Sequence, residues 1–225
     1  CQSLIDMVYA LDEPLADPSC LNVQFIARAA RAQGIKVLLS GAGGDDLFTG
    51  YRRHQALFWS KYLDLFPSGL IRSAEVLLQQ FNTSNHNIRR LHKFISSMQY
   101  VGDDKLISYF DWLPKTEINA LYSKDWLENK AKFDFTHPMT TFLNSFESSD
   151  SFDRALALEQ NFFLPDHNLC YTDKMAMQEG VEVRVPFLDN NLVDLSQRIP
   201  SAFKQRGNVG KWILKKAMRP YLPDE

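Results

Sequence analysis

The sequence has only three cysteines, Cys1, Cys20 and Cys170, at spacings too wide for a C-x-x-C metal or redox pair. An odd number also argues against a disulfide framework, so a reducing cytoplasm is the expected location. No apolar run approaches the roughly 20 residues that cross a bilayer. The first residues lack the basic region and apolar core of a signal peptide. We therefore expect a protein without a membrane partner.

The sequence also lacks a strong excess of positive or negative charge. Lys and Arg number 25 and Asp and Glu number 27, and no long run of either sign occurs. Nucleic acid and anionic lipid are therefore not expected partners, because counterion release would have no obvious source. The sequence contains no H-E-x-x-H, no G-x-S-x-G and no Cys/His cluster at zinc spacing. These absences argue against metalloproteases, serine hydrolases and structural zinc domains.

The 225 residues are 45% apolar and 23% charged, a composition typical of a folded globular protein. The clearest strand is residues 35–39, which follow a helical pattern ending at Gly34 and precede a loop of small residues. This order of helix, strand, loop and helix is typical of a parallel α/β layer. We expect the strand to be buried, with partner strands that lie outside this segment or have weak signals.

Most of the remaining sequence has helical patterning. Asp17-Pro18 marks the start of one helix, a second is expected from Asp45 to about Phe66, and a break is expected at residues 164–166. The many aromatic residues of the middle region are interpreted as the core of a helix bundle. Further helices are expected at 4–11, 173–180, 188–199 and 211–221, in a succession between 67 and 163, and an extended stretch at 181–185.

The sharpest local signal is the sequence LSGAGGDDLF, which follows the predicted strand and opens a helix. Ligands bind at such places in open α/β folds, because glycines let a phosphate approach backbone N–H groups. The adjacent carboxylates of Asp45 and Asp46 would repel a phosphate unless Mg²⁺ bridged them. The alternative is structural: two acids complement the dipole of a helix N-terminus, and glycines form tight turns.

Two further signals are weaker when taken alone. Glu182 and Arg184 lie two residues apart in an extended stretch, so both side chains point to one face, and a buried ion pair is their ordinary interpretation. Lys211 follows Gly210 at a predicted helix start. A lysine there opposes the helix dipole unless an anionic group lies beside it, and by itself it indicates no function.

Taken in order, LDEPLADPS, LLSGAGGDDLFTGY, DKMAMQEGVEVRVPFLD and GKWILKKAMRPYLP resemble the synthetase domain of glutamine-hydrolysing asparagine synthetases. The resemblance covers nearly all of residues 1–225 and implies one partial synthetase domain with an adenine-nucleotide α-hydrolase type of α/β fold. This segment would be mostly helical, with about one clear parallel strand. The implied enzyme is a carbon–nitrogen ligase in which ATP adenylates a small-molecule carboxylate. Ammonia from a glutaminase domain then displaces AMP. Whether the protein forms a homo-oligomer is left open.

The resemblance also implies roles for individual residues. Ser40, Gly41, Gly43 and Gly44 would line the nucleotide. Asp45 would help to hold Mg²⁺ and pyrophosphate, and Lys211 would lie near the phosphates as the catalytic cation. The chemistry is coherent, since a metal neutralises a leaving pyrophosphate and fixed positive charge stabilises the transition state.

Several family features are not in this sequence. The pyrophosphate loop Ser-Gly-Gly-x-Asp-Ser is expected before Cys1, and an Arg-x-Lys segment is expected beyond Glu225, so the isolated chain is expected to be inactive. Ala42 stands where many members have Glu or Asp. The acceptor is therefore left open, since relatives on the same scaffold amidate sugar acids or cyclise peptides. A catalytically inactive helical module that acts by binding is the alternative from another class.

Overall fold

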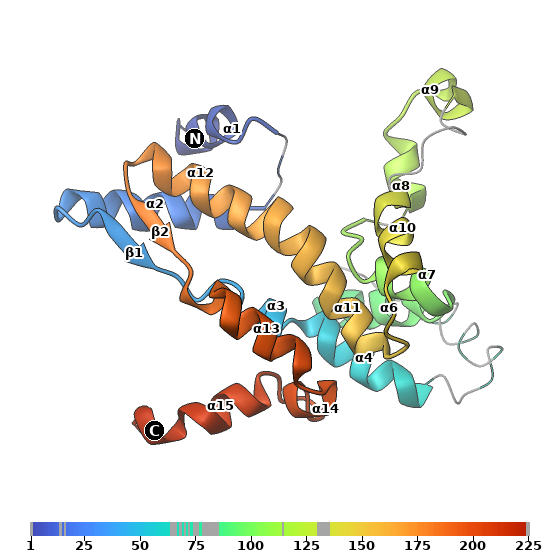
Figure 1. Ribbon diagram of the computed structural model, residues 1–225. Helices are drawn as coiled ribbons and strands as arrows, with labels where there is room; N and C mark the ends of the chain where they lie inside the picture. Colours follow the sequence, from blue (N-terminus) through green and yellow to red (C-terminus); the bar gives the residue numbers. More distant parts are fainter. Residues whose placement is uncertain are drawn as a thin grey trace. The chain divides into compact units, whose positions relative to one another are not determined.

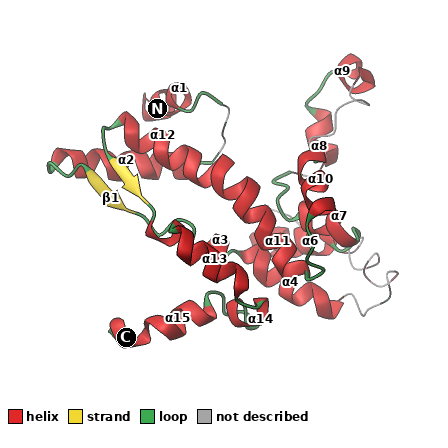
Figure 2. Ribbon diagram, in the orientation of Figure 1, coloured by secondary structure: helices red, strands yellow, loops and turns green. Residues whose placement is uncertain are grey.

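The structure is a computed structural model that describes residues 2–13, 15, 17–63, 67, 69, 71, 73, 77, 86–113, 115–129 and 136–223. The chain divides into two compact units. Cys1–Gly50 and Leu156–Glu225 form the first, and Tyr51–Ala155 forms the second. Helices dominate both units, as Figures 1 and 2 show, which agrees with the expectation of a mostly helical segment.

The first unit contains two strands and most of the residues predicted to have a function. Its helices are α1 (Gln2–Ala10), α2 (Ser19–Ala32), α3 (Gly44–Phe48), the end of α11 (Ser151–Leu158), η2 (Glu159–Leu169), α12 (Cys170–Gln178), η3 (Pro186–Leu188), α13 (Asn190–Arg198), α14 (Ser201–Lys204), α15 (Trp212–Met218) and η4 (Arg219–Tyr221).

Strands β1 (Val37–Leu39) and β2 (Glu182–Arg184) pair in parallel, with Leu38 opposite Val183. The two strands lie side by side in Figure 1, next to α2 and α12. A strand within 35–39 and an extended stretch within 181–185 are thus both confirmed. The partner that β1 needs is the stretch with the weaker sequence signal.

One face of this sheet is covered and the other is largely exposed. Leu38 and Val183 pack against the buried side chains of Ala27, Ala176 and Val181. On the opposite face, Val37 is 41% exposed and Leu39 is 75% exposed. The prediction of a buried strand is therefore wrong for this face, because the described helices α2 and α12 pack against the other face.

Helix α2 packs through small side chains rather than through its large apolar ones. Cys20, Ala27 and Ala30 are buried, whereas Phe25 and Ile26 are 48% and 60% exposed. The amide of Gln24, on the same buried face, donates to Gln178 Oε1 of α12 at 3.0 Å. Small residues allow close packing, and Ala27 of α2 packs with Ala176 of α12 against the covered face of the sheet.

Two predicted helix boundaries are wrong. The single helix expected from Asp45 to about Phe66 is two helices, α3 and α4 (Arg52–Leu63), separated at Thr49 by a positive φ of 65°; Phe66 lies outside the described residues. The break expected at 164–166 does not occur, since Pro165 lies inside η2, a π-helix that continues α11 into α12. Pro165 lacks the N–H that a helix interior uses, and the helix around it has the wider pairing of residues five apart.

The second unit is a set of helices. Its elements are α4, α6 (His86–Ser97), α7 (Gly102–Ser108), α8 (Lys115–Ala120), α9 (Lys124–Asn129), α10 (His137–Ser145) and the start of α11. The aromatic residues predicted to form its core are only partly buried: Tyr109 is 8% exposed, but Trp59, Tyr62 and Trp112 are 45%, 53% and 62% exposed. Phe133 and Phe135 belong to the part of the sequence that the structure does not describe.

Arg154 organises one end of this unit. Its guanidinium donates to both carboxylate oxygens of Asp103, at 2.9 and 2.6 Å, and to the backbone carbonyls of Leu143, Phe146 and Ser148. One side chain thereby joins α7, the end of α10 and the start of α11. Among the described residues, no helix is long and apolar enough to span a membrane.

Candidate active site

The loop that carries the sharpest sequence signal starts at the carboxyl end of β1. Ser40 continues the pairing with β2, because its N–H donates to Arg184 O at 2.8 Å. Its hydroxyl oxygen accepts a hydrogen bond from Ala42 N at 3.2 Å and so closes a short turn. Gly41 is exposed, and a side chain there would meet no atom within 4 Å. The predicted site loop thus begins as an open backbone turn beside the sheet.

The next two glycines have packing reasons that sequence patterns could not show. Gly43 adopts a φ of 88°, and a Cβ at this position would collide with the side chain of Leu188. Gly44 is buried, with Phe187 3.6 Å from the position of a Cβ. The loop is therefore shaped by its contact with η3, which follows β2.

Asp45 and Lys211 are brought together from two distant parts of the sequence. Asp45 lies in the first turn of α3, and Lys211 immediately precedes α15. The Asp45 Oδ2 to Lys211 Nζ distance is 3.1 Å, and the two side chains are 34% and 30% exposed. Two of the residues predicted from separate motifs thus form one partly exposed ion pair.

Gly50 makes this pairing sterically possible. A Cβ on Gly50 would collide with the Asp45 carboxylate and would lie 2.9 Å from Lys211 Cε. On its other side, a Cβ on Gly210 would lie 3.1 Å from Gly50 Cα. The backbones of residues 50 and 210 therefore approach closely next to the ion pair. Sequence reasoning missed Gly50; the only signal was a glycine inside an otherwise helical pattern.

The side chain of Asp46 does not lie in the same environment as that of Asp45. Its side chain is fully buried, whereas the carboxylate of Asp45 is partly exposed. The backbone carbonyl of Asp46 accepts a hydrogen bond from Gln160 Nε2 of η2 at 3.3 Å. The negative charge of Asp46 also acts on Tyr171: burial raises the pKa of the Tyr171 hydroxyl, and the charges of Asp17 and Asp46 raise it further. The two adjacent acids thus have different environments, and only Asp45 is accessible to a ligand.

Glu182 and Arg184 pair as the spacing predicts, with Arg184 Nε donating to Glu182 Oε1 at 2.8 Å. The pairing lowers the pKa of Glu182 and raises that of Arg184. The prediction that this ion pair is buried is wrong, since the side chains are 56% and 63% exposed. Both lie on the exposed face of the sheet with Val37 and Leu39.

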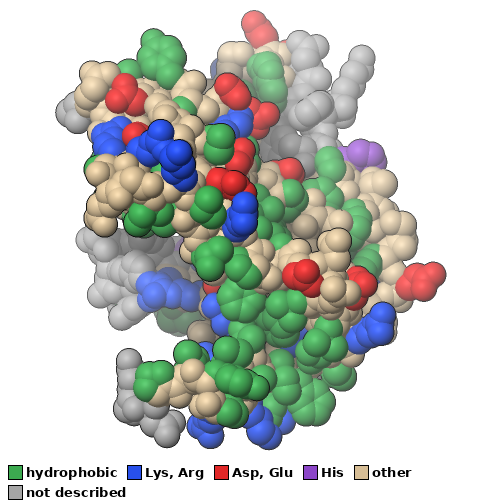
Figure 3. Space-filling model, turned by 60° about the vertical axis from the view of Figure 1, so that its left-hand side comes forward, with side chains coloured by type: hydrophobic (Ala, Val, Ile, Leu, Met, Phe, Trp, Pro, Cys, Tyr) green, Lys and Arg blue, Asp and Glu red, His purple; other side chains and the backbone are tan. Residues whose placement is uncertain are grey.

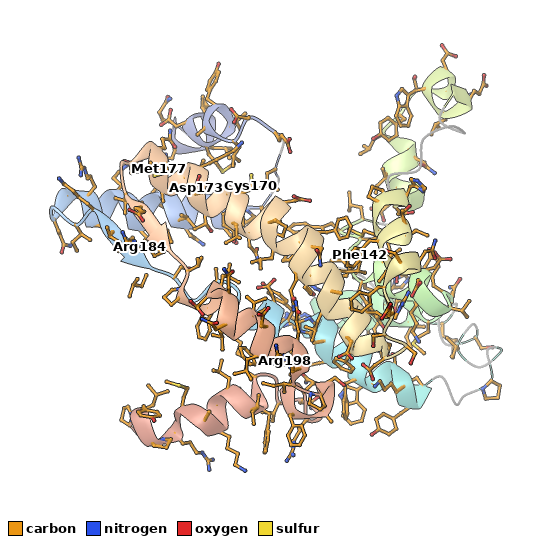
Figure 4. The ribbon with its side chains drawn as sticks, in the orientation of Figure 1. Phe142, Cys170, Asp173, Met177, Arg184 and Arg198 are labelled. Atoms are coloured by element: carbon orange, nitrogen blue, oxygen red, sulfur yellow. The ribbon has the colours of Figure 1, made fainter. Side chains whose placement is uncertain are left out.

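On the face of the molecule drawn in Figure 3, acidic and basic side chains are interspersed. Figure 4 labels Arg184 at the strands and Cys170, Asp173 and Met177 along α12. Among the residues that the structure describes, no group of three or more His, Cys, Asp and Glu side chains could hold a metal ion by itself.

A parallel strand pair followed by a glycine-rich loop at the end of β1 is a feature of α/β proteins, and the Asp45–Lys211 pair lies next to that loop. The family model described as asparagine synthase matches residues 1–225. The chain therefore belongs to the asparagine synthase family.

Individual relatives agree with this assignment. The chain is 29% identical, over 98% of its length, to the "Putative asparagine synthetase [glutamine-hydrolyzing]" of Mycobacterium tuberculosis (strain ATCC 25618 / H37Rv), of which it covers 32%. It is 26% identical to asparagine synthetase [glutamine-hydrolyzing] 1 of Bacillus subtilis (strain 168), with 97% of this chain and 33% of the relative covered. Amidase chyE of Penicillium rubens is 26% identical, with 98% and 35% covered.

The chain thus spans about a third of the length of these curated relatives. No solved structure matches it. The family is shown by the match over the whole chain, and the relatives include both synthetases and an enzyme named as an amidase.

Proposed function

We propose that this chain forms part of an ATP-dependent amide-forming synthetase, a carbon–nitrogen ligase. A carboxylate oxygen of the acceptor attacks the α-phosphorus of ATP, the bond to the β-phosphate oxygen breaks, and pyrophosphate leaves. Ammonia derived from glutamine then attacks the resulting acyl adenylate at its carbonyl carbon, and AMP leaves with the bonding electron pair. The observation that carries the proposal is the partly exposed Asp45–Lys211 pair beside the loop that follows β1.

Lys211 is the group we assign to the phosphates. Its side chain is 30% exposed and its ammonium is held by a carboxylate on one side, so its other N–H donors can face an incoming phosphate. Positive charge that is already in position stabilises a leaving pyrophosphate without reorganisation during the reaction. Lys211 therefore serves as the catalytic cation in this proposal.

Asp45 fits a magnesium ion that arrives with the nucleotide. Mg²⁺ in nucleotide sites is bound by one or two carboxylates, with substrate phosphates and waters completing the shell. Asp45 supplies one such carboxylate, partly exposed and at hydrogen-bonding distance from Lys211. The metal, when bound, would neutralise the negative charge of the leaving pyrophosphate. Lys211 balances the charge of Asp45 when no metal is bound.

The residues of the loop have two different roles in this proposal: some contact the nucleotide, and others set the path of the backbone. We assign Ser40 and Gly41 to the lining of the nucleotide, since they form an open turn at the end of a parallel strand. Gly43 and Gly44 pack on Leu188 and Phe187, so their part is to give the loop its path toward α3. Ala42 has no side chain that could act as a base, and the acceptor is therefore proposed only as a carboxylate.

The exposed face of the sheet supports the fold that the proposal requires. Val37 and Leu39 present apolar surface, and parallel sheets are normally covered on both faces. We propose that β1 and β2 belong to a larger parallel sheet of the adenine-nucleotide α-hydrolase type, whose other elements cover these side chains.

The test uses the full product of the gene and measures magnesium-dependent pyrophosphate release. Asp45→Asn is expected to slow release by about a hundredfold. Its effect on stability should stay below about 1 kcal/mol, the value of a carboxylate at a helix N-terminus. Asp104→Asn is the matched control, because Asp104 also lies exposed in the first turn of a helix, α7.

Lys211→Ala is expected to slow release to a similar degree. Lys215→Ala is its control, since Lys215 is exposed one turn later in α15. Unchanged release in both Asp45→Asn and Lys211→Ala would reject the site. Absence of any nucleotide-dependent activity in the unmodified protein would favour the binding module instead.

A further inference from the structure

Thr49 has a backbone conformation that is unusual for its residue type. It follows α3 with φ 65° and ψ 163°, a region that is essentially restricted to glycine. Thr49 is β-branched, and its side chain is fully buried. The residue thus ends α3 at a conformational disadvantage, and the surrounding contacts must hold it there.

The contacts of its hydroxyl group explain how it is held. Thr49 Oγ1 donates to Lys204 O at 3.1 Å and accepts from the backbone N–H of Lys211 at 3.3 Å. The same N–H of Lys211 also donates to Phe48 O at 3.0 Å. One buried hydroxyl therefore uses both its donor and its acceptor capacity, and it joins the end of α3 to the end of α14 and to the start of α15.

The residue held by this hydroxyl is the proposed catalytic cation. Lys211 itself adopts a left-handed conformation, with φ 55° and ψ 31°. That backbone direction sends its side chain past Gly50 to the carboxylate of Asp45. The backbone of Lys211 is bound to residues 48 and 49, and its ammonium is bound to Asp45, all at or just after α3.

We propose that Thr49 is a positioning residue that sets Lys211 against Asp45, and that its hydroxyl is the reason for a threonine at a position whose backbone suits glycine. The proposal rests on the proposed function, because it assigns Thr49 a part in placing the cation that faces the phosphates. Thr49 touches neither the nucleotide nor the acceptor; it acts through the backbone of Lys211.

Three substitutions separate the hydroxyl from the backbone. Thr49→Val keeps the shape and removes the hydroxyl, Thr49→Ser keeps the hydroxyl, and Thr49→Gly removes the hydroxyl while relaxing the backbone. Pyrophosphate release by the full gene product gives kcat and KM for ATP, and thermal unfolding of each variant gives stability. Thr140→Val is the control, since Thr140 Oγ1 also donates to a backbone carbonyl, that of Thr136, in the second unit.

We expect Thr49→Val and Thr49→Gly to lower kcat by about tenfold, the value of one misplaced hydrogen-bonded contact. KM for ATP should change less than kcat. The kcat values of Thr49→Ser and Thr140→Val should stay within about twofold of that of the unmodified enzyme. Thr49→Gly should unfold at a higher temperature than Thr49→Val, because both lack the hydroxyl but only glycine accepts this backbone conformation without strain. A role in stability alone would instead make activity follow the unfolding temperature.

Hydrogen exchange gives a readout that does not depend on activity. The Lys211 amide should exchange faster in Thr49→Val and Thr49→Gly than in Thr49→Ser. If Lys211→Ala slows release but Thr49→Val and Thr49→Gly keep the normal kcat, the Thr49 proposal is wrong and the proposed function stands. If Lys211→Ala has no effect either, the proposed function is the part that fails.

Discussion

The imidazole Nε2 of His167 lies 2.9 Å from Oδ2 of Asp17, which joins η2 to the residues that precede α2. The other carboxylate oxygen of Asp17 accepts from Ser19 N at 2.8 Å and begins α2, as the sequence Asp17-Pro18 predicts. Burial acts to raise the pKa of Asp17, but the hydrogen bonds from Ser19 and the pairing with His167 outweigh it. The pKa of Asp17 therefore lies below its ordinary value.

This relationship gives a prediction for acid unfolding. A carboxyl whose pKa is lower in the folded state adds stability above its unfolded pKa of about 3.9, and that stability is lost as pH falls through the folded pKa. Asp17→Asn keeps the helix cap but removes the charge, so we expect a loss of about 1 kcal/mol at pH 7. The difference from the unmodified chain should shrink below about pH 4.

Denaturant unfolding at pH 7 and pH 3 measures both values. Asp166→Asn is the control, because Asp166 is exposed beside His167 in the same element. A loss that stays constant between the two pH values would contradict the assigned charge interaction.

Arg154 should be hard to replace. Its guanidinium fills a site with a carboxylate and three carbonyls, and its side chain is only 16% exposed. A lysine cannot supply the same fork of donors, so Arg154→Lys is expected to destabilise the second unit by about 2–4 kcal/mol. Lys61→Met is the contrast, because Lys61 Nζ and Asp150 Oδ2 lie 3.8 Å apart and both side chains are exposed. This substitution should lower the free energy of unfolding by less than about 1 kcal/mol. Equal losses in urea unfolding would argue against this reading of Arg154.

Gly50→Ala should disturb the site more than the fold. The added Cβ collides with the Asp45 carboxylate and approaches Lys211 Cε, so the ion pair must separate. We expect pyrophosphate release by the full gene product to fall by at least about tenfold. Gly69→Ala is the control because a Cβ there meets nothing within 4 Å. Normal release by Gly50→Ala would mean that the separation of Asp45 from Lys211 has no consequence for activity.

Leu39 tests the proposed extension of the sheet. Its side chain is 75% exposed in the 225-residue chain, so Leu39→Ser should change the stability of that chain by less than about 0.5 kcal/mol. If further elements cover this face in the full gene product, the same substitution should cost about 2 kcal/mol there. Leu121→Ser is the control, since Leu121 is 78% exposed in the second unit. A small effect of Leu39→Ser in both forms would argue against a larger sheet.

The 225-residue chain by itself is expected to show no ATP–pyrophosphate exchange. The resemblance places the pyrophosphate loop outside this segment, and the described residues contain no acidic cluster that could hold the metal without it. The full gene product, assayed beside it, serves as the positive control. Robust exchange by the isolated chain would show that the nucleotide site is complete without that loop.

Local sequence signals determined much of the secondary structure. The helices end before Gly34 and Gly180, Asp17 and Asp189 accept hydrogen bonds at helix starts, and both extended stretches occur where alternation and β-branched residues predict them. These features depend on neighbours within a few residues, which a single sequence displays directly. The family motifs are also local, and the match over the whole chain agrees with them.

The tertiary structure decided what those segments do together. It paired β1 with β2 and left exposed the sheet face that carries Val37, Leu39 and the Glu182–Arg184 pair. It also buried Asp46 while leaving Asp45 accessible, and it brought Lys211 to Asp45. It also ended the helix at Thr49, where propensity alone predicts continuation. Such outcomes depend on contacts between residues far apart in the sequence, and the buried hydrogen bonds at Thr49 outweigh its local backbone preference.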